Sequence, residues 1–220
     1  LAPIFLFAYL REIGISRLAG LLGALSFTYA GFMVSGLGQT AMFTNAVMWM
    51  PLMLIALERA RTRSFVRCLI GAGLAYAMAV LTGLGQGFLY AGLIALAYGL
   101  FLSLIANEKL LSWQRWKPFF VAVGGVGLAA ALAAFQIAET MQAQRLSIRR
   151  TLTYEIFSGG SFSPKQFWQS LINPIYHHNY EATAYVPLLA VLFAIVAIIA
   201  ACFSPRTHRR TFFWLLIAVF

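Results

Sequence analysis

The chain has 220 residues, of which 61% are hydrophobic and only 10% are charged. A soluble globular domain carries about a quarter of its residues as charged side chains, so this composition, with a mean hydropathy of +0.82, excludes an ordinary soluble domain and predicts a lipid bilayer as the solvent. The net charge is +10, but we expect no nucleic-acid partner, because the basic residues follow the pattern that orients membrane proteins.

Both ends of the chain are apolar segments too short to cross a bilayer. Residues 1–10 (LAPIFLFAYL) and 211–220 (TFFWLLIAVF) each supply about half of the roughly 20 helical residues that a span needs. The chain also begins at Leu1 without a Met. We therefore expect residues 1–220 to be a single transmembrane domain, an internal piece truncated at both ends.

Six further apolar stretches lie between these ends, each near the length that a helix needs to cross the hydrocarbon core. They cover residues 18–37, 41–57, 65–81, 88–105, 119–138 and 184–203. A helix satisfies its backbone hydrogen bonds within one segment, which makes it the expected spanning structure. The sequence predicts an all-α fold, a polytopic transmembrane helical bundle with six complete spans and a partial span at each end.

The apolar stretches also contain signals of how they pack. Small residues recur four positions apart, as in Gly73 and Ala77, a spacing that lets membrane helices approach closely. Asn45 and Pro51 interrupt the second stretch. They mark either a packing kink or a contact with a ligand, and the sequence leaves both interpretations open.

The basic residues are concentrated in alternate connectors, which predicts the orientation of the chain. Twelve of the sixteen Lys and Arg residues fall on one side: Arg11, Arg17, Arg59, Arg61, Arg63, Arg67, Lys109, Arg115, Lys117, Arg206, Arg209 and Arg210. The turns near residues 36–40 and 83–87, on the other side, carry none. We expect the basic side to be cytoplasmic.

A long connector at residues 139–183 is expected on the extracytoplasmic side, although it contains the other four basic residues. These are Arg145, Arg149, Arg150 and Lys165. Clustered arginines on that side need a partner, which is an anionic ligand, a lipid phosphate or a nearby Glu.

The same connector carries the pattern of a helix start. Ser163 and Pro164 suit the cap and the first helical position, and Phe167, Trp168 and Leu171 then share one face. We predict a short amphipathic helix at about 164–172, lying either in the outer membrane interface or against neighbouring protein.

One short motif occurs twice. Residues 35–39 (SGLGQ) recur as residues 82–86 (TGLGQ), and each copy ends in a glutamine, Gln39 or Gln86. Two interpretations stay open. The copies are either two well-formed turns that use the conformational freedom of Gly, or two turns that line the same outward-facing cavity, where the Gln amide binds a polar ligand.

No metal site is predicted within the chain. His177 and His178 are adjacent, so their side chains diverge in a helix or strand, and neither Cys nor Asp lies nearby to complete a tetrahedral site. Glu155 and Glu181 leave a looser oxygen-rich ion site as an alternative to hydrogen bonds with lipid headgroups. The chain contains no Asp, which also excludes a Ser/His/Asp triad.

Several short motifs occur in a recognisable order. They are the basic loop at 11–17, FTYAGF at 27–32, WMPL at 49–52, LER at 57–59, AFQ at 134–136, SIR at 147–149, the helix start at 163–164 and YVPLL at 185–189. In this order they resemble bacterial YfhO-type membrane proteins, which belong to the polyprenyl-phosphate-sugar-dependent GT-C glycosyltransferases. The resemblance extends over nearly the whole chain and rests on its overall pattern.

The resemblance implies a GT-C-like integral membrane glycosyltransferase of the bacterial plasma (inner) membrane. Such an enzyme moves a sugar from a polyprenyl-phosphate carrier to a cell-envelope acceptor on the outer face. The catalytic Asp of the family would lie upstream of Leu1, so no catalytic residue is assigned within the chain. The resemblance also implies no cofactor within residues 1–220 and leaves a divalent metal open for the full-length protein.

The same resemblance implies that the chain contributes the carrier site. Arg149, with Arg150 and Arg145 as neighbours, is expected to neutralise the lipid phosphate when the glycosidic bond breaks. Arg149 is favoured because it alone matches the family's Ser-x-Arg pattern. The residues expected to line the cavity are Gln39, Gln86, Gln136, Glu139, His177 and His178. The alternative role of the arginines is to anchor the connector to headgroups.

Two other functions stay open. A transporter or flippase of lipid-linked sugars needs a similar outward cavity, and a non-catalytic membrane assembly subunit needs no catalytic group at all. The repeated motif recurs after two spans and keeps its orientation, whereas an inverted repeat would favour transport. Under the enzyme interpretation the partners are membrane lipid, a polyprenyl-phosphate-linked sugar and the cell-envelope acceptor.

Overall fold

The computed structural model describes residues 1–30, 33–34, 41–83 and 85–146, together with isolated positions nearer the C-terminal end. Those positions are residues 165, 168–169, 191–192, 194–196, 198–199, 210 and 213–214. The regular elements of this part of the chain are the helices α1 (Ala2–Glu12), α2 (Arg17–Thr28), α4 (Ala41–Val47), α5 (Met50–Arg59), α6 (Phe65–Val80), α7 (Gly85–Leu104), α8 (Trp113–Leu132) and α9 (Ala134–Leu146). The predicted all-helical fold is confirmed for the described residues.

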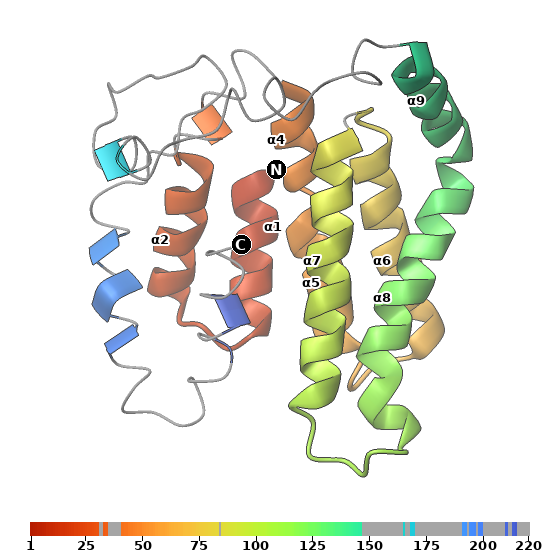
Figure 1. Cartoon of the computed structure of the whole chain (residues 1–220). Coiled ribbons are helices and arrows are strands. Elements are labelled where there is room, and N and C mark those ends of the chain that lie inside the picture. Colours follow the sequence, from red (N-terminus) through yellow and green to blue (C-terminus); the bar gives the residue numbers. More distant parts are fainter. Residues whose placement is uncertain are drawn as a thin grey trace.

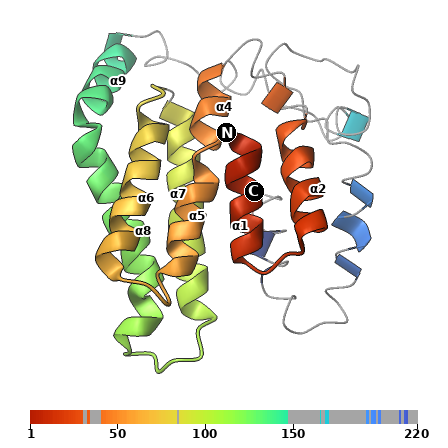
Figure 2. The same cartoon turned by 180° about the vertical axis from the view of Figure 1, so that it is seen from behind.

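The helices run up and down, so that successive loops fall at opposite ends of the bundle (Figure 1). Helices α5, α6, α7 and α8 pack together, and the pair α1 and α2 lies beside them, with α1 against α5. Seen from behind, α4 and α5 follow each other on the side nearest to α1 (Figure 2).

Three loops lie at the same end of the bundle, which we call the basic end. They are residues 13–16, 60–64 and 105–112, and with the adjoining helix ends they carry nine Lys and Arg residues: Arg11, Arg17, Arg59, Arg61, Arg63, Arg67, Lys109, Arg115 and Lys117. The α6–α7 turn and the junction of α8 with α9 lie at the opposite end (Figure 1). The structure thus places these three basic connectors at one end of the bundle, as the sequence predicts.

Serine residues begin three helices at the basic end. The Oγ of Ser16 accepts a hydrogen bond from the backbone N–H of Ala19 at 3.3 Å at the start of α2. Ser64 and Ser112 hold the corresponding positions before α6 and α8. Ser suits this position because its short side chain can accept from the unpaired N–H groups of the first turn. Of the three, Ser16 makes this hydrogen bond, and Ser64 and Ser112 do not.

The second predicted span, residues 41–57, is two short helices. Helix α4 ends at Val47 and α5 begins at Met50, with a turn at Met48 and Trp49 between them. Pro51 has no N–H to bond to the carbonyl four residues earlier, and its ring crowds that carbonyl. Helix α4 therefore ends at Val47, because the carbonyl of Val47 is the one that an N–H at position 51 would have bonded to.

The fifth predicted span, residues 119–138, is also interrupted. Helix α8 ends at Leu132, and α9 begins at Ala134 with its axis bent by 76° from that of α8. Ala133, between them, has φ −105° and ψ 23°, outside the α-helical range. As a result Gln136 and Glu139 lie on a separate helix, which continues to Leu146 through the first residues of the predicted connector.

Only some of the predicted spans correspond to helices that are long enough to cross a membrane. By length and composition, α7 with its 20 residues could cross a membrane, and α8 with α9 would be a second candidate if the bent pair formed one span. Helices α2 and α6 are apolar but have 12 and 16 residues, against the roughly 20 that a span needs. The six complete spans therefore stay a prediction.

Two predicted elements fall largely outside the described residues. The sixth span, 184–203, is described at seven positions, all of them helical. In the predicted helix at 164–172, Lys165, Trp168 and Gln169 are helical and exposed, and the other positions lie outside the described residues.

Helices α6, α7 and α8 approach closely because a glycine lies at each of their close contacts. A Cβ placed on Gly73 of α6 would lie 2.6 Å from Cδ2 of Leu128 and 3.0 Å from its Cβ. A Cβ on Gly99 of α7 would lie 2.9 Å from Cβ of Ala122 and 3.1 Å from the carbonyl of Pro118, both on α8. Small side chains thus set the spacing of the three helices, as the sequence predicts for a membrane bundle.

The outward sides of the helices are apolar. On α6, Val66, Ile70, Leu74 and Met78 follow one another at intervals of four and are 43–60% exposed. Similar exposed stripes occur on α2 and α7: Leu18, Leu21, Leu22 and Leu25, and Leu89, Leu93, Leu100 and Leu104. Contiguous exposed apolar surface on this scale indicates contact with lipid or with another protein.

The glycine contacts lead to a prediction with an internal control. Gly73→Ala should lower the free energy of unfolding by about 1–3 kcal/mol, because the added methyl group overpacks the contact with α8. Gly71→Ala, two residues away on the same helix, should be neutral or stabilising by up to about 1 kcal/mol, since no atom lies within 4 Å of its Cβ position. Thermal unfolding in detergent measures both, and equal effects would contradict the packing described.

Candidate functional site

The end of the bundle opposite the basic end contains the second copy of the repeated motif, in the turn between α6 and α7. Gly83 has φ +79°, a left-handed conformation that favours Gly because a Cβ would be strained there. Its backbone N–H donates to the carbonyl of Val80 at 3.1 Å, and the hydroxyl of Thr82 donates to the carbonyl of Ala79 at 2.7 Å. This copy is therefore a tight turn, as the simpler of the two interpretations predicts.

The turn is in contact with α9. Nε2 of Gln136 lies 3.2 Å from the position that a Cβ on Gly83 would take, and Cγ2 of Thr140 lies 3.9 Å from that position on Gly85. The Nε2 of Gln136 also donates to Oγ1 of Thr140 at 3.5 Å. Residues more than fifty positions apart in the chain thus place amide, hydroxyl and backbone groups at the same end of the bundle.

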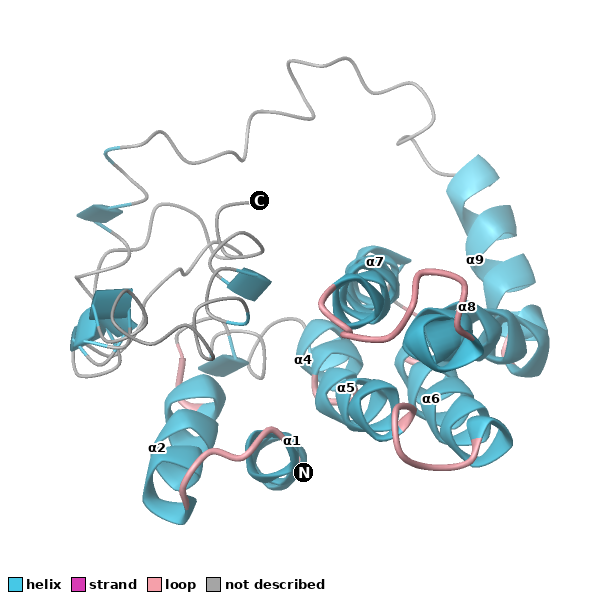
Figure 3. Cartoon of the chain, turned by 90° about the horizontal axis from the view of Figure 1, so that it is seen from below, coloured by secondary structure: helices cyan, strands magenta, loops and turns pink. Residues whose placement is uncertain are grey.

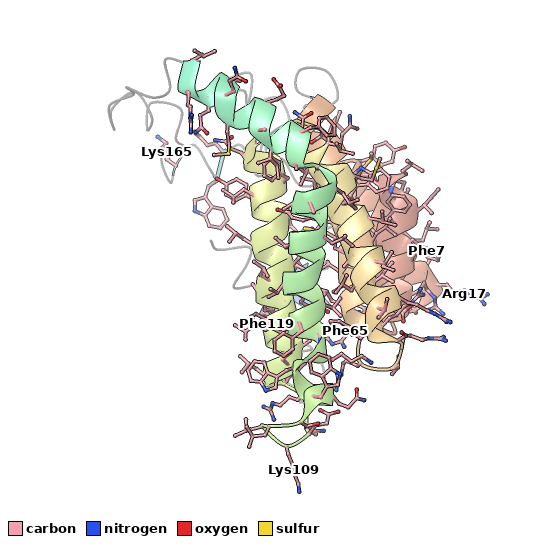
Figure 4. All side chains as sticks on the ribbon, turned by 90° about the vertical axis from the view of Figure 1, so that its right-hand side faces the viewer. Phe7, Arg17, Phe65, Lys109, Phe119 and Lys165 are labelled. Carbon is pink, nitrogen blue, oxygen red and sulfur yellow. The ribbon has the colours of Figure 1, made fainter. Side chains whose placement is uncertain are left out.

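Helix α9 projects from this end and is largely exposed (Figure 3). It has no buried residue, and Figure 4 shows it leaning away from α8 at the end opposite the labelled Lys109. Glu139 and Arg145 are exposed on it, Gln136 is half-buried, and Gln86 is exposed at the start of α7. Because its axis is bent by 76° from that of α8, α9 leans to the side of the bundle and does not continue along it.

The structure thus brings together part of the predicted site. Gln136 meets the turn that leads into Gln86, and Glu139 and Arg145 follow on the same helix. The other predicted residues, Gln39, Arg149, Arg150, His177 and His178, lie outside the described residues. The cavity and the phosphate site therefore stay predictions.

Metal chemistry was predicted to be absent, and the structure tests this only partly. Among the residues described, no three of His, Cys, Asp and Glu lie together in a group that could hold a metal ion. The two adjacent histidines and their flanking Glu155 and Glu181 lie outside that part of the chain.

The sequence did not predict a polar cluster inside the bundle, within the last two turns of α1, α5 and α7 at the basic end. Oε1 of Glu58 accepts a hydrogen bond from the hydroxyl of Tyr98, which in turn accepts one from the hydroxyl of Tyr9 at 2.9 Å. Nη2 of Arg210 donates to Oε2 of Glu58 at 3.1 Å. The four side chains come from α5, α7, α1 and the C-terminal part of the chain.

Aromatic rings enclose this cluster. The ring of Tyr98 lies 5.3 Å from that of Phe213, 5.4 Å from that of Trp214 and 6.0 Å from that of Phe101, measured between centroids. The side chain of Glu58 is only 8% exposed, and that of Arg210 is 30% exposed. A carboxylate so enclosed needs its full set of partners, since an unpaired buried charge is costly.

The basic end contains a second ion pair and several capped helix ends. Oε2 of Glu12 accepts two hydrogen bonds from Arg59, at 2.7 Å and 2.9 Å, and this pairing raises the pKa of Arg59. The guanidinium of Arg115 donates to the carbonyls of Leu104 and Glu108, at the end of α7 and in the loop after it. Lys117, which is buried, donates to the carbonyl of Arg63 at 2.5 Å.

Comparison with known proteins does not assign the chain to a family. No protein-family model matches the chain, and neither a curated protein nor a solved structure is significantly similar to it.

The Glu58 cluster leads to a stability prediction. Glu58→Gln should lower the free energy of unfolding by about 2–4 kcal/mol, because Arg210 and Tyr98 lose the charged acceptor that they share. Exchanging the charges, with Glu58→Arg and Arg210→Glu together, should recover part of that loss. Denaturant unfolding in detergent measures the change.

Glu108 provides the matched control, because its side chain is exposed and makes no ion pair among the described residues. Glu108→Gln should change the free energy of unfolding by less than about 0.5 kcal/mol. A similar loss in the variants of Glu58 and Glu108 would mean that the buried cluster does not stabilise the fold.

Proposed function

We propose that the chain is part of a multi-pass membrane glycosyltransferase, with its basic end in the cytoplasm and its site for a polyprenyl-phosphate-linked sugar at the opposite end. The observation that carries the proposal is the contact of Gln136 and Thr140 on α9 with the glycine turn before Gln86. This contact brings together an amide, a hydroxyl and backbone groups, all of which can bind a polar ligand, at the end of the bundle opposite the basic loops. Transfer to a cell-envelope acceptor follows from the resemblance to GT-C enzymes.

The membrane location is supported by the distribution of side chains. Small residues fill the contacts between α6, α7 and α8, whereas the exposed stripes consist of large aliphatic side chains. In water this arrangement would leave a large apolar surface uncovered, but in a bilayer it places the side chains against lipid tails. The basic loops at one end then agree with the positive-inside rule.

The carrier site is supported by the position and shape of α9. In the proposed orientation, a helix that turns by 76° from α8 at the outer end of the bundle runs close to the membrane surface, where the phosphate of a lipid carrier is located. Arg145 is exposed in its last turn, and Arg149 and Arg150 follow directly in the chain. Such cations stabilise the negative charge that develops on the carrier phosphate during transfer.

The orientation can be measured by cysteine labelling in intact cells. In a background with Cys68→Ser and Cys202→Ser, a membrane-impermeant maleimide should label Ser161→Cys and should leave Lys109→Cys unlabelled until the membrane is permeabilised. The reason is that residue 161 belongs to the proposed outer connector, whereas residue 109 lies at the basic end. The reverse labelling would overturn the orientation and the site built on it.

The enzymatic step can be measured as transfer of labelled sugar from a polyprenyl-phosphate donor by the complete protein in membranes. Arg149→Ala should reduce the rate about 100-fold or more, the usual cost of removing one group that stabilises developing charge. Arg61→Ala removes the same charge at the basic end and should leave the rate within about twofold.

Three results would contradict this proposal in different ways. Equal rates in wild type and Arg149→Ala would remove Arg149 from the carrier site. Equal losses in the Arg149 and Arg61 variants would point to a general effect of charge. If wild type moved the lipid-linked sugar across the bilayer without transferring it, a flippase would replace the enzyme.

A further inference from the structure

The cations of the basic end fall into two groups that the sequence does not distinguish. Arg11, Arg59, Arg115 and Lys117 are held by a carboxylate or by backbone carbonyls. Arg63 and Arg67 are exposed and belong to the other group, with Arg17, Arg61 and Lys109, because no side chain or carbonyl of the described residues accepts a hydrogen bond from these cations. Of this group, Arg63 and Arg67 stand nearest to the start of α6.

Arg67 lies in line with an exposed apolar stripe on α6. Val66, Ile70, Leu74 and Met78 follow one another at intervals of four, and Arg67 stands three positions before Ile70 and seven before Leu74, so these side chains share one side of α6, which we call the α6 outer face. Viewed along the bundle, α6 lies at its edge, with α5 and α8 as neighbours (Figure 3). The face therefore has one cation at the basic end and aliphatic side chains along the rest, and a second cation, Arg63, lies in the loop just before the helix.

The dimensions of this face match one phospholipid molecule. From Arg67 to Met78 the helix rises by about 16 Å, close to half of the roughly 30 Å hydrocarbon thickness of a bilayer. An acyl chain that starts at the two arginines therefore lies along the stripe for about the depth of one leaflet. This match uses the membrane location that belongs to the proposed function.

The charge of the face selects the kind of headgroup. Helices α6 and α8 contain no Asp or Glu, and Glu58, the acidic residue of the other neighbour α5, is 8% exposed and bound to Arg210. The face therefore offers no free carboxylate that would pair with the ammonium of a zwitterionic lipid. Two exposed guanidinium groups four positions apart in the chain instead suit a phosphate that carries a net negative charge. We propose that the α6 outer face binds an anionic phospholipid of the cytoplasmic leaflet, with its phosphate at Arg63 and Arg67 and one acyl chain along Val66, Ile70, Leu74 and Met78.

Thermal unfolding of the complete protein in a neutral detergent tests this proposal, with phosphatidylglycerol or phosphatidylcholine added. Phosphatidylglycerol at about ten times its Kd should raise the Tm by about 3–6 °C, and phosphatidylcholine should raise it less. The double variant Arg63→Gln and Arg67→Gln should bind phosphatidylglycerol about 25-fold more weakly, about fivefold for each arginine, and should lose the increment specific to this lipid.

Lys109→Gln is the control, because Lys109 is exposed at the same end but lies in the α7–α8 loop, away from the α6 outer face. This variant should keep the full phosphatidylglycerol increment. An equal loss in the control and the double variant, or an unchanged increment in the double variant, would overturn the proposal. Should the double variant unfold too early for comparison, native mass spectrometry of retained phosphatidylglycerol at low temperature gives the same contrast.

Failure of this proposal is distinguishable from failure of the proposed function. Sugar transfer is assigned to the opposite end, so the double variant should keep its transfer rate in membranes while its response to phosphatidylglycerol is lost. Conversely, Arg149→Ala should keep the full lipid response whether or not it transfers sugar.

Discussion

The arrangement of the helices at the basic end depends on the hydrogen bonds that the carboxylate of Glu58 accepts from Tyr98 and Arg210. An enclosed carboxylate has to find several donors, because water cannot supply them. Its donors come from Tyr98 on α7 and from Arg210, and Tyr98 in turn accepts a hydrogen bond from Tyr9 on α1. One charge on α5 thus fixes the positions of α1, α7 and Arg210 relative to one another. Helices α6 and α8 join this group through contacts of glycine with backbone and small side chains, which leave little freedom to slide.

The sequence predicts which segments are helical better than it predicts how their axes run. The predicted stretches 65–81 and 88–105 agree closely with Phe65–Val80 and Gly85–Leu104, because an apolar stretch with turn residues on each side determines where a helix begins and ends. The same reasoning joined residues 41–57 and 119–138 into single spans, since an apolar stretch shows only that a segment avoids water. Pro51 gave a visible signal of the first break, whereas nothing in the sequence around Ala133 distinguishes the second.

The site was harder to predict than the fold because its parts meet through tertiary contacts. Gln136 contacts Gly83 where α9 turns sharply from α8. The family resemblance placed Gln136 and Gln86 in one cavity, but a helix predicted to run straight through residue 138 gave no sign of this contact. The Glu58 cluster was missed for a related reason. Glu58 stands next to Arg59 at the edge of a basic loop, where a charged residue is usually solvated, and its partner Arg210 lies 152 positions away. The aromatic residues Tyr9 and Tyr98, polar groups within apolar segments, were the available signal.

The charges of the basic end show why counting Lys and Arg residues gives orientation but not function. The orientation rule requires only that positive charge stay on one side, and a cation meets it equally well when a carbonyl or carboxylate holds it. Arg59, Arg115 and Lys117 contribute to stability whatever their part in orientation, because they satisfy a carboxylate on α1 and carbonyls at the end of α7 and in the loop before α6. Arg63 and Arg67 satisfy no acceptor in the described chain, and a cation in the first turn of a helix, as Arg67 is, opposes the helix dipole instead of stabilising it. Fold stability therefore gives no reason for an arginine at either position, and an anionic group outside the chain supplies the partner that the fold does not.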